Sequence, residues 1–293
     1  GKITWKPLCS DGHTYANGVC DYCGAKDPNY APPADVTRIF GADRYETAFK
    51  TAEVLKQQLG VEKFDNIVVA CGDNFADALG GSYLAAKKNA PILLVRGANV
   101  NDVKNYIKQN LTAGGTVYLL GGVNAVPKAM ESGLTGFTVK RLGGADRYAT
   151  NLLILEEAGI RSGAEVLVCT ATNFADSLSA SATGKPILLV WNEGGTLYGR
   201  QPEFLESLNV CYFMIIGGEN AVSTKLEEAL EAYGQTSRLA GNNRFETSAL
   251  VANAYFENPR AAVLAYAWNY PDGLCGGSLA YAINAPLILT MTN

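Results

Sequence analysis

Three cysteines and the chain's only histidine lie close together near its start, in a spacing that suits metal binding. They are Cys9, His13, Cys20 and Cys23, in the pattern C-x3-H-x6-C-x2-C. Three thiolates and one imidazole suit tetrahedral Zn²⁺, and Gly24 after the last pair allows the tight turn that brings both sulfurs to one ion. The pattern predicts a structural zinc site. The alternative is one disulfide plus a free thiol, although three cysteines cannot pair off evenly.

A motif with two arginines occurs three times, as RIFGADRYET from Arg38, RLGGADRYAT from Arg141 and RLAGNNRFET from Arg238. The Asp or Asn before the second arginine predicts a helix N-cap, and a Glu three residues later completes a capping box in the first and third copies. The second arginine then takes the first helical position, where the helix dipole disfavours a cation. A partner must offset this cost for each of them: Arg44, Arg147 and Arg244.

Two interpretations of these arginines stay open. In the first, each forms an ion pair with a carboxylate of the same or the next copy, for which Asp77, Asp176 and Asp272 are the candidates. In the second, the three guanidinium groups and the helix N-termini donate hydrogen bonds to phosphates or carboxylates of an extended anionic polymer. Threefold repetition favours the second, because several weak sites gain affinity by avidity.

The candidate aspartates belong to a second repeated block, NFADAL from Asn74, NFADSL from Asn173 and NYPDGL from Asn269. Its Asn is expected to cap a helix, and its Asp takes the third helical position. Both residues persist in all three copies, which predicts a fixed contact within the protein. Glycine pairs at Gly121 and Gly217 each end a strand and predict a tight turn before a helix capped by Asn124 or Asn220.

Composition excludes several function classes. A net charge of −4 gives no global basic field for nucleic acid, so an anionic partner must be held by a local cluster of arginines. The longest apolar runs are far shorter than the roughly 20 residues of a membrane span. With His13 assigned to the cysteine cluster, no histidine remains for a nucleophile and base pair, and no nucleotide-binding fingerprint is present. A carboxylate pair such as Asp77 with Glu46 leaves glycan hydrolysis as the enzymatic alternative.

The repeats define the organisation of the chain. A cysteine-rich segment, 1–27, and a proline-rich linker, 28–35, precede three modules of about one hundred residues, a domain's length rather than a solenoid unit's. The modules are 36–140, 141–237 and 238–293, and the third lacks a counterpart of the second half of the others.

Within the first module, apolar runs alternate with amphipathic ones. Strands are expected at 66–72, 90–95, 116–122 and 137–142, and helices at 75–88, 100–111 and 125–133. Buried strands alternating with helices predict an α/β fold with Rossmann-like, mostly parallel sheets covered on both faces. Ligands of such sheets bind at the carboxyl ends of the strands, where the repeated motifs lie.

The three R-x-x-G-x-x-R-[YF]-x-T copies, the N-[FY]-x-D blocks and the PILLV-like runs, in this order, resemble the cell wall binding repeat 2 family of Gram-positive bacteria over residues 36–293. The resemblance implies three tandem modules packed about a pseudo-threefold axis. It also implies an extracellular, wall-associated anchor, not an enzyme, that holds a surface protein noncovalently to an anionic wall polymer, teichoic-acid-like or polysaccharide. By the same resemblance, polymer contact or intermodule packing is expected at Arg44, Arg147, Arg244 and the loops after the PILLV runs.

Two departures and two alternatives accompany the resemblance. Asn242 and Asn243 replace Ala-Asp in the third motif, and the third module is incomplete. The cysteine-rich segment lies outside the repeats and resembles small zinc ribbons with a structural role. Two other functions compete with this one. The first is a wall-active glycan hydrolase, and the second is a scaffold or adhesin whose repeats bind no polymer.

Overall fold

The computed structural model describes residues 13, 15–16, 18–20, 25–28, 35–209 and 212–291 of the chain. It divides into two compact units, Gly1–Arg38 and Ile39–Asn293. In the first unit, β1 (Tyr15–Ala16) pairs antiparallel with β2 (Val19–Cys20), and Cys20 is buried. Of the predicted zinc ligands, His13 and Cys20 lie within the described residues, whereas Cys9 and Cys23 lie outside them.

The first module of the larger unit is a four-stranded parallel sheet in the order β4-β3-β5-β6. Its strands are β3 (Phe64–Cys71), β4 (Ile92–Val95), β5 (Leu111–Leu120) and β6 (Thr138–Leu142). Its α-helices are α1 (Arg44–Leu59), α2 (Gly81–Lys88) and α3 (Val100–Asn110). All four residues of β4 are buried, as continuous apolar runs in doubly covered sheets require. The predicted α/β class with parallel sheets is confirmed.

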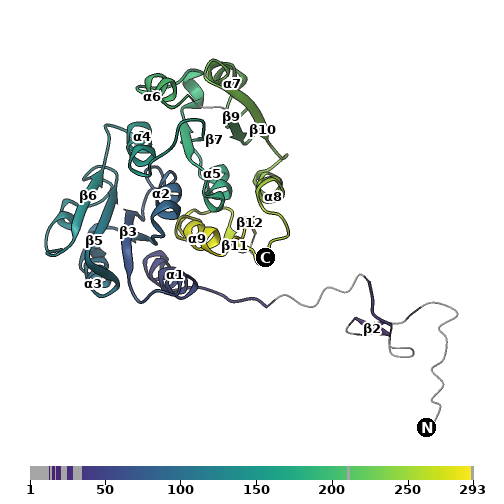
Figure 1. Ribbon diagram of the computed structural model, residues 1–293, viewed down its shortest axis with the longest axis horizontal. Helices are drawn as coiled ribbons and strands as arrows, with labels where there is room; N and C mark the ends of the chain where they lie inside the picture. The colour runs from purple at the N-terminus through teal and green to yellow at the C-terminus, as the bar shows by residue number, and fades with distance from the viewer. Residues whose placement is uncertain are drawn as a thin grey trace, which may run out of the picture. The chain divides into compact units, whose positions relative to one another are not determined.

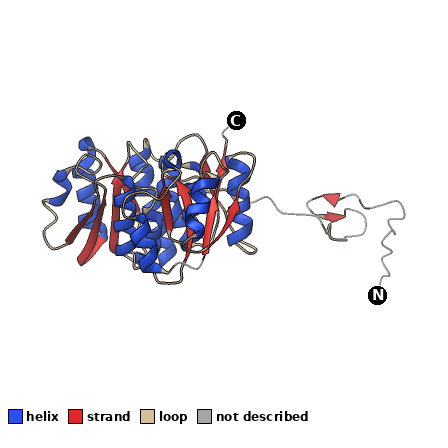
Figure 2. Ribbon diagram, turned by 90° about the horizontal axis from the view of Figure 1, so that it is seen from above, coloured by secondary structure: helices blue, strands red, loops and turns tan. Residues whose placement is uncertain are grey.

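The second module repeats this topology, in the order β8-β7-β9-β10 and again all parallel. Its strands are β7 (Glu165–Thr170), β8 (Ile187–Val190), β9 (Tyr212–Ile216) and β10 (Gln235–Leu239). Its α-helices are α4 (Arg147–Glu157), α5 (Ala175–Ala180), α6 (Gln201–Leu208) and α7 (Thr224–Glu231). Helices lie on both sides of the strands in the view of Figure 2.

The third module contributes α8 (Arg244–Tyr255), β11 (Val263–Tyr266), α9 (Pro271–Ala282) and β12 (Leu287–Thr290). Among the described residues its sheet has only the parallel pair β11-β12. Leu264 of β11 is 61% exposed, whereas Val69 and Val168, at the same register positions of the other sheets, are fully buried. Val69 shares a core cluster with Val103 and Ile107 of α3, and Val168 shares one with Phe204 and Leu205 of α6, whereas no helix follows β12 within the described residues.

The three modules pack in a cycle, as expected for a pseudo-threefold arrangement. The helix that begins with the motif arginine packs on a helix of another module: α1 on α9, α4 on α2, and α8 on α5. Helices α2, α5 and α9 lie together at the centre of the larger unit in Figure 1. Small residues allow this approach, since a Cβ at Gly80 would collide with Asn151 and one at Gly277 would come within 2.5 Å of Ser181 Oγ. One hydrophobic core runs through all three modules.

Two predicted helices are wrong in extent. The helix expected over 75–88 begins only at Gly81, after a run of turns, because the Gly80–Gly81 pair disfavours a helix and Gly80 lies against Asn151. The helix expected over 125–133 is a single 3₁₀ turn, Lys128–Glu131, because Pro127 has an extended ψ and Gly133 a positive φ. Within the described residues, no helix combines the length and apolar character needed to cross a bilayer.

Candidate functional site

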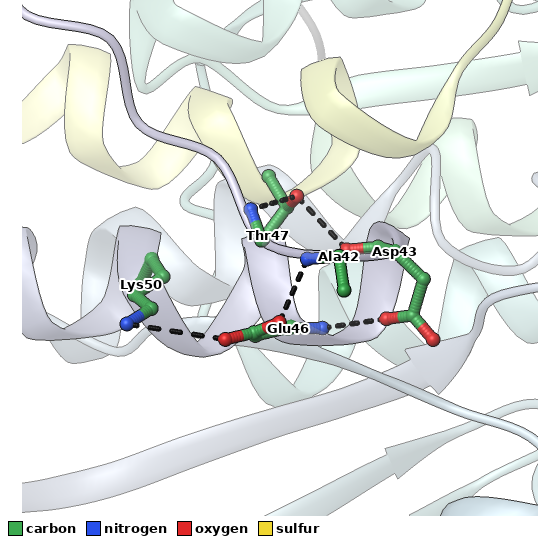
Figure 3. Close-up of polar contacts among 6 residues, drawn as sticks. Ala42, Asp43, Glu46, Thr47 and Lys50 are labelled. Carbon is green, nitrogen blue, oxygen red and sulfur yellow. Dashed lines mark hydrogen bonds and ion pairs between the residues drawn. The ribbon is translucent and has the colours of Figure 1, made fainter.

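Each repeated arginine motif folds as a capped helix start, as predicted. Asp43 Oδ1 accepts hydrogen bonds from the backbone N–H groups of Tyr45 and Glu46, both at 2.9 Å. Glu46 reaches back to the N–H of Ala42 at 2.7 Å, and Thr47 Oγ1 accepts from the N–H of Gly41 at 3.0 Å (Figure 3). These bonds satisfy donors that a helix N-terminus leaves unpaired.

The same contacts recur in the other two copies and explain the fixed letters of the motif. Asp146 and Asn243 cap α4 and α8, each through two backbone N–H groups. The motif threonines, Thr150 and Thr247, accept from the N–H of the motif glycine in their own copies. Glycine is required there because a Cβ on Gly41 would collide with Glu46. Helix capping therefore accounts for the acid, the threonine and the glycine, but not for the arginine.

The arginine at the first helical position bonds to a backbone carbonyl beyond the end of the first strand of its own module. Nη1 of Arg44, Arg147 and Arg244 donates to Gly72 O at 2.6 Å, Ala171 O at 2.7 Å and Ala267 O at 2.6 Å, respectively. Each acceptor residue is itself fixed, because its N–H bonds to the last residue of the neighbouring strand. These carbonyls give each cation the favourable partner that its place at a helix N-terminus demands. The arginines thus lie at the carboxyl ends of the strands.

These three guanidinium groups keep donors that no acceptor in the described part of the chain uses. Within residues 35–209 and 212–291, every hydrogen bond from them comes from Nη1, so Nε and Nη2 have no protein acceptor there. No carboxylate of that region lies within 4.0 Å of them. All three side chains are half-buried. A half-buried guanidinium with free donors can bind a phosphate or carboxylate group.

The repeated aspartates act on the arginines across module boundaries, at longer range than the direct ion pairs that one interpretation expected. Burial raises the pKa of Asp176, to about 6, and the charge of Arg244 opposes that rise. Burial raises the pKa of Asp77 as well, opposed by Thr150 and Arg147. The pKa of Asp272 is raised by partial desolvation, opposed by Arg44. Each aspartate is therefore linked electrostatically to the arginine of another module, in a closed cycle.

The raised pKa of Asp176 predicts a pH effect on stability. The folded protein holds this proton more tightly than the unfolded chain, whose value is near 3.8, so stability from this group is greatest below about pH 4 and falls until about pH 6. Asp176→Asn removes the ionisation. The unfolding free energy of the variant minus that of the unaltered protein should be about 2 to 3 kcal/mol larger at pH 7 than at pH 4. Urea unfolding at both pH values measures the change, and identical pH dependence in both proteins would refute the assignment.

The side chains of Asp77 and Asp176 each pack against a glycine of their own module. Gly121 and Gly217 directly follow β5 and β9, with φ of 97° and 110°, and a Cβ on either would collide with Oδ2 of Asp77 or Asp176. The tight turns predicted there are present, but the predicted caps Asn124 and Asn220 are not N-caps. The N-cap of the short 3₁₀ helix is Pro127, and that of α7 is Ser223. The residues with which each helix was expected to begin form a turn after the glycine pair instead.

The first arginine of the motif has a different environment from the second. Arg141 donates to Gly121 O at 2.8 Å and pairs with Glu131. Arg238 likewise donates to Gly217 O at 2.8 Å and pairs with Glu227 at 2.6 Å. These two arginines stabilise the glycine turns. Arg38, the counterpart in the first copy, is exposed.

An aromatic cluster joins the three modules, and the sequence analysis missed it. Phe75, Phe174 and Tyr270 lie at the same position of the three N-[FY]-x-D blocks, with ring centroids 5.3 to 5.7 Å apart and edge-to-face geometry. Arg44 lies 5.7 Å from the Tyr270 ring and Arg244 lies 5.7 Å from the Phe174 ring. The aromatic letter shared by all three blocks was the available signal.

The asparagines of the same blocks border this cluster in sequence and are exposed. Their side-chain oxygens accept hydrogen bonds from backbone N–H groups of the following turn. The donors are Ala76 for Asn74, Ala175 for Asn173 and Tyr270 for Asn269. The asparagines shape the turn that carries the aromatic ring and the aspartate. The structure thus brings together the second arginine, the aspartate and the aromatic residue of neighbouring modules.

The chain is similar to known proteins over most of its length. A family profile described as "Cell wall binding domain 2 (CWB2)" matches residues 38–131, 141–227 and 238–293. N-acetylmuramoyl-L-alanine amidase LytC of Bacillus subtilis is 26% identical over 262 residues, 87% of this chain and 50% of that protein. The Amidase enhancer of the same organism is 28% identical over 258 residues, 86% of this chain and 34% of that protein.

Two solved structures from Clostridium difficile share the fold. Cwp8 superposes with a TM-score of 0.76 and 28% identity, covering 86% of this chain and 45% of Cwp8. Cwp6 gives a TM-score of 0.76 at 24% identity, over 90% of this chain and 44% of Cwp6. The chain spans half or less of the length of each of these four proteins.

Proposed function

The chain belongs to the cell wall binding domain 2 family. We propose that it holds a surface protein noncovalently to an anionic polymer of the cell wall. The observation that carries this proposal is the set of three half-buried arginines, Arg44, Arg147 and Arg244, each with donors that no acceptor in the described residues uses. Three repeated sites on one compact unit can engage successive anionic groups of a polymer, and their affinities combine by avidity.

The nature of the polymer follows from the charges. With a net charge of −4, the protein attracts an anion only through local sites, which favours a polymer with spaced phosphate or carboxylate groups over nucleic acid. A teichoic-acid-like polymer or an anionic polysaccharide of a Gram-positive wall has this pattern. The proposed location is therefore extracellular, at the wall.

A binding role is favoured over catalysis. The relatives include one named as an amidase and one named as an amidase enhancer, and a region shared by proteins of different named activity fits attachment better than chemistry. The carboxylate pair considered for glycan hydrolysis has structural contacts instead: Glu46 bonds the N–H of Ala42, and Asp77 lies against Gly121. A scaffold without polymer affinity is the remaining alternative.

Cosedimentation with purified Gram-positive walls over a range of NaCl concentrations tests the proposal. The bound fraction should fall steeply between 0.05 and 0.5 M salt, because the Debye length decreases from about 14 Å to about 4 Å over this range and charge contacts weaken accordingly. Absence of binding at low salt would favour the scaffold. Turnover of wall glycan by the purified protein would favour the hydrolase.

For the cysteine-rich segment we propose a structural zinc ion held by Cys9, His13, Cys20 and Cys23. The support is the chemistry of three thiols and one imidazole at this spacing, together with the burial of Cys20 on the short β1–β2 hairpin. Metal analysis of protein prepared under reducing conditions should find about one zinc per chain. Cys20→Ser should lower this content to near zero. Protein that contains no zinc under these conditions would contradict the proposal.

A further inference from the structure

The three modules differ at the residue that follows their second strand. That residue is Arg96 after β4, Trp191 after β8 and Met291 after β12. Arg96 places its guanidinium carbon 4.7 Å from the centre of the Tyr45 ring, so the first module presents a cation at this position. The second module presents an indole instead.

In the second module, Trp191 belongs to an exposed pair of aromatic rings. Trp191 and Tyr198 are each 37% exposed, with centroids 5.5 Å apart and ring planes at 90°. Tyr198 in turn packs on Tyr148 of the arginine motif, at 4.9 Å. Tyr148 therefore connects the pair to the motif that carries Arg147.

Two polar side chains fix the loop that carries these rings. Gln201, fully buried, accepts the N–H of Tyr198 at 2.9 Å and donates to Leu189 O at 2.7 Å. At the other end, Asn192 accepts the N–H of Ser223 at 2.6 Å and donates to Asn220 O at 3.0 Å. The rings are thus held in place before any ligand arrives, which lowers the entropy cost of binding.

The chemistry of this surface suits an uncharged sugar better than an anion. Ring faces carry negative charge density that attracts the weakly positive C–H groups of a pyranose. Glu193 accepts from Trp191 Nε1 at 2.5 Å, and its carboxylate can accept hydroxyl hydrogens while repelling a phosphate. We propose that Trp191 and Tyr198 bind a neutral sugar ring of the wall polymer, so that the second module adds a salt-resistant contact to the arginine sites. This inference rests on the proposed function.

The test is the affinity for purified Gram-positive walls at 0.05 M and 1 M NaCl, for the unaltered protein, Trp191→Ala and Trp191→Phe. At 1 M salt the arginine contacts are screened to about 3 Å. The unaltered protein should still bind there, Trp191→Ala should bind about tenfold more weakly, and Trp191→Phe should stay within about threefold because it keeps a ring. Val123→Ala, at another exposed apolar residue, is the matched control and should bind as the unaltered protein does.

The outcomes separate the two proposals. If the unaltered protein binds at 0.05 M salt but not at 1 M, or if Trp191→Ala binds normally at 1 M, the sugar contact is refuted while anchoring through charge stands. If the unaltered protein binds at neither salt concentration, the proposed function fails and the sugar contact falls with it. Thermal unfolding of each variant confirms that the comparison is between folded proteins.

Discussion

Replacing Arg44, Arg147 and Arg244 together by alanine should weaken binding to purified walls by about 1,000-fold at low salt. Each side chain is expected to supply one charge-assisted contact worth about 1.4 kcal/mol, a factor of about ten, and three independent sites multiply. Single substitutions should each cost about tenfold. Cosedimentation isotherms measure the affinities. The size of the combined effect distinguishes three polymer contacts from one dominant site.

The control for this variant must match its change in charge. Lys63, Lys108 and Lys128 are exposed lysines, and replacing all three by alanine removes the same three positive charges. That variant should bind within about threefold of the unaltered protein, because none of these lysines belongs to the repeated arginine sites and exposed charges are screened by salt. Since each motif arginine also bonds a carbonyl, circular dichroism must first show that the arginine variant is folded. A folded arginine variant with full affinity would assign these residues to module packing.

Gly217→Ala should destabilise the protein by about 4 kcal/mol. Gly217 has φ of 110°, which an alanine adopts only with strain of about 1 to 3 kcal/mol. The added methyl group would also collide with Asp176 Oδ2 and come within 3.0 Å of the Ala221 side chain. Because Asp176 is itself packed at the boundary with the third module, it cannot move away without loosening that contact. Urea unfolding gives the free energy directly.

The adjacent glycine provides the matched control for this substitution. A Cβ on Gly218 would meet no atom within 4 Å, and its φ is not positive, so Gly218→Ala should change stability by less than about 0.5 kcal/mol. Adding Asp176→Ala to Gly217→Ala should recover the part of the loss that comes from the collision and leave the backbone strain. Equal stability of the two glycine variants would show that the close approach of the Asp176 carboxylate is not real.

Local sequence signals predicted much of this structure. Asp43, Asp146 and Asn243 were recognised as N-caps because capping depends on residues within one helical turn. The alternation of strands and helices followed from hydrophobic periodicity. The predicted start of the helix at residue 75 was wrong. The helix begins at Gly81, next to the contact between Gly80 and Asn151 of another module, and a contact between modules cannot be seen in a local sequence pattern.

The sequence could not assign the partners of the arginines for a similar reason. Their acceptors are backbone carbonyls of Gly72, Ala171 and Ala267, and a carbonyl leaves no trace in the choice of side chain. The aspartates proposed as ion-pair partners act on the arginines only at longer range, and which module each one approaches depends on the cyclic packing of helices. The aromatic cluster was missed because a single aromatic residue in each block has the pattern of ordinary core packing.

The most direct test of the central claim compares binding of the unaltered protein to walls before and after chemical removal of their anionic polymers. If the arginine sites hold such a polymer, binding to intact walls should be strong and sensitive to salt. Stripping should remove both the salt-sensitive binding and the contact assigned to Trp191, because both are made to the same polymer. Equal, salt-sensitive binding to intact and stripped walls would contradict the account, because the ligand would then be the peptidoglycan that remains.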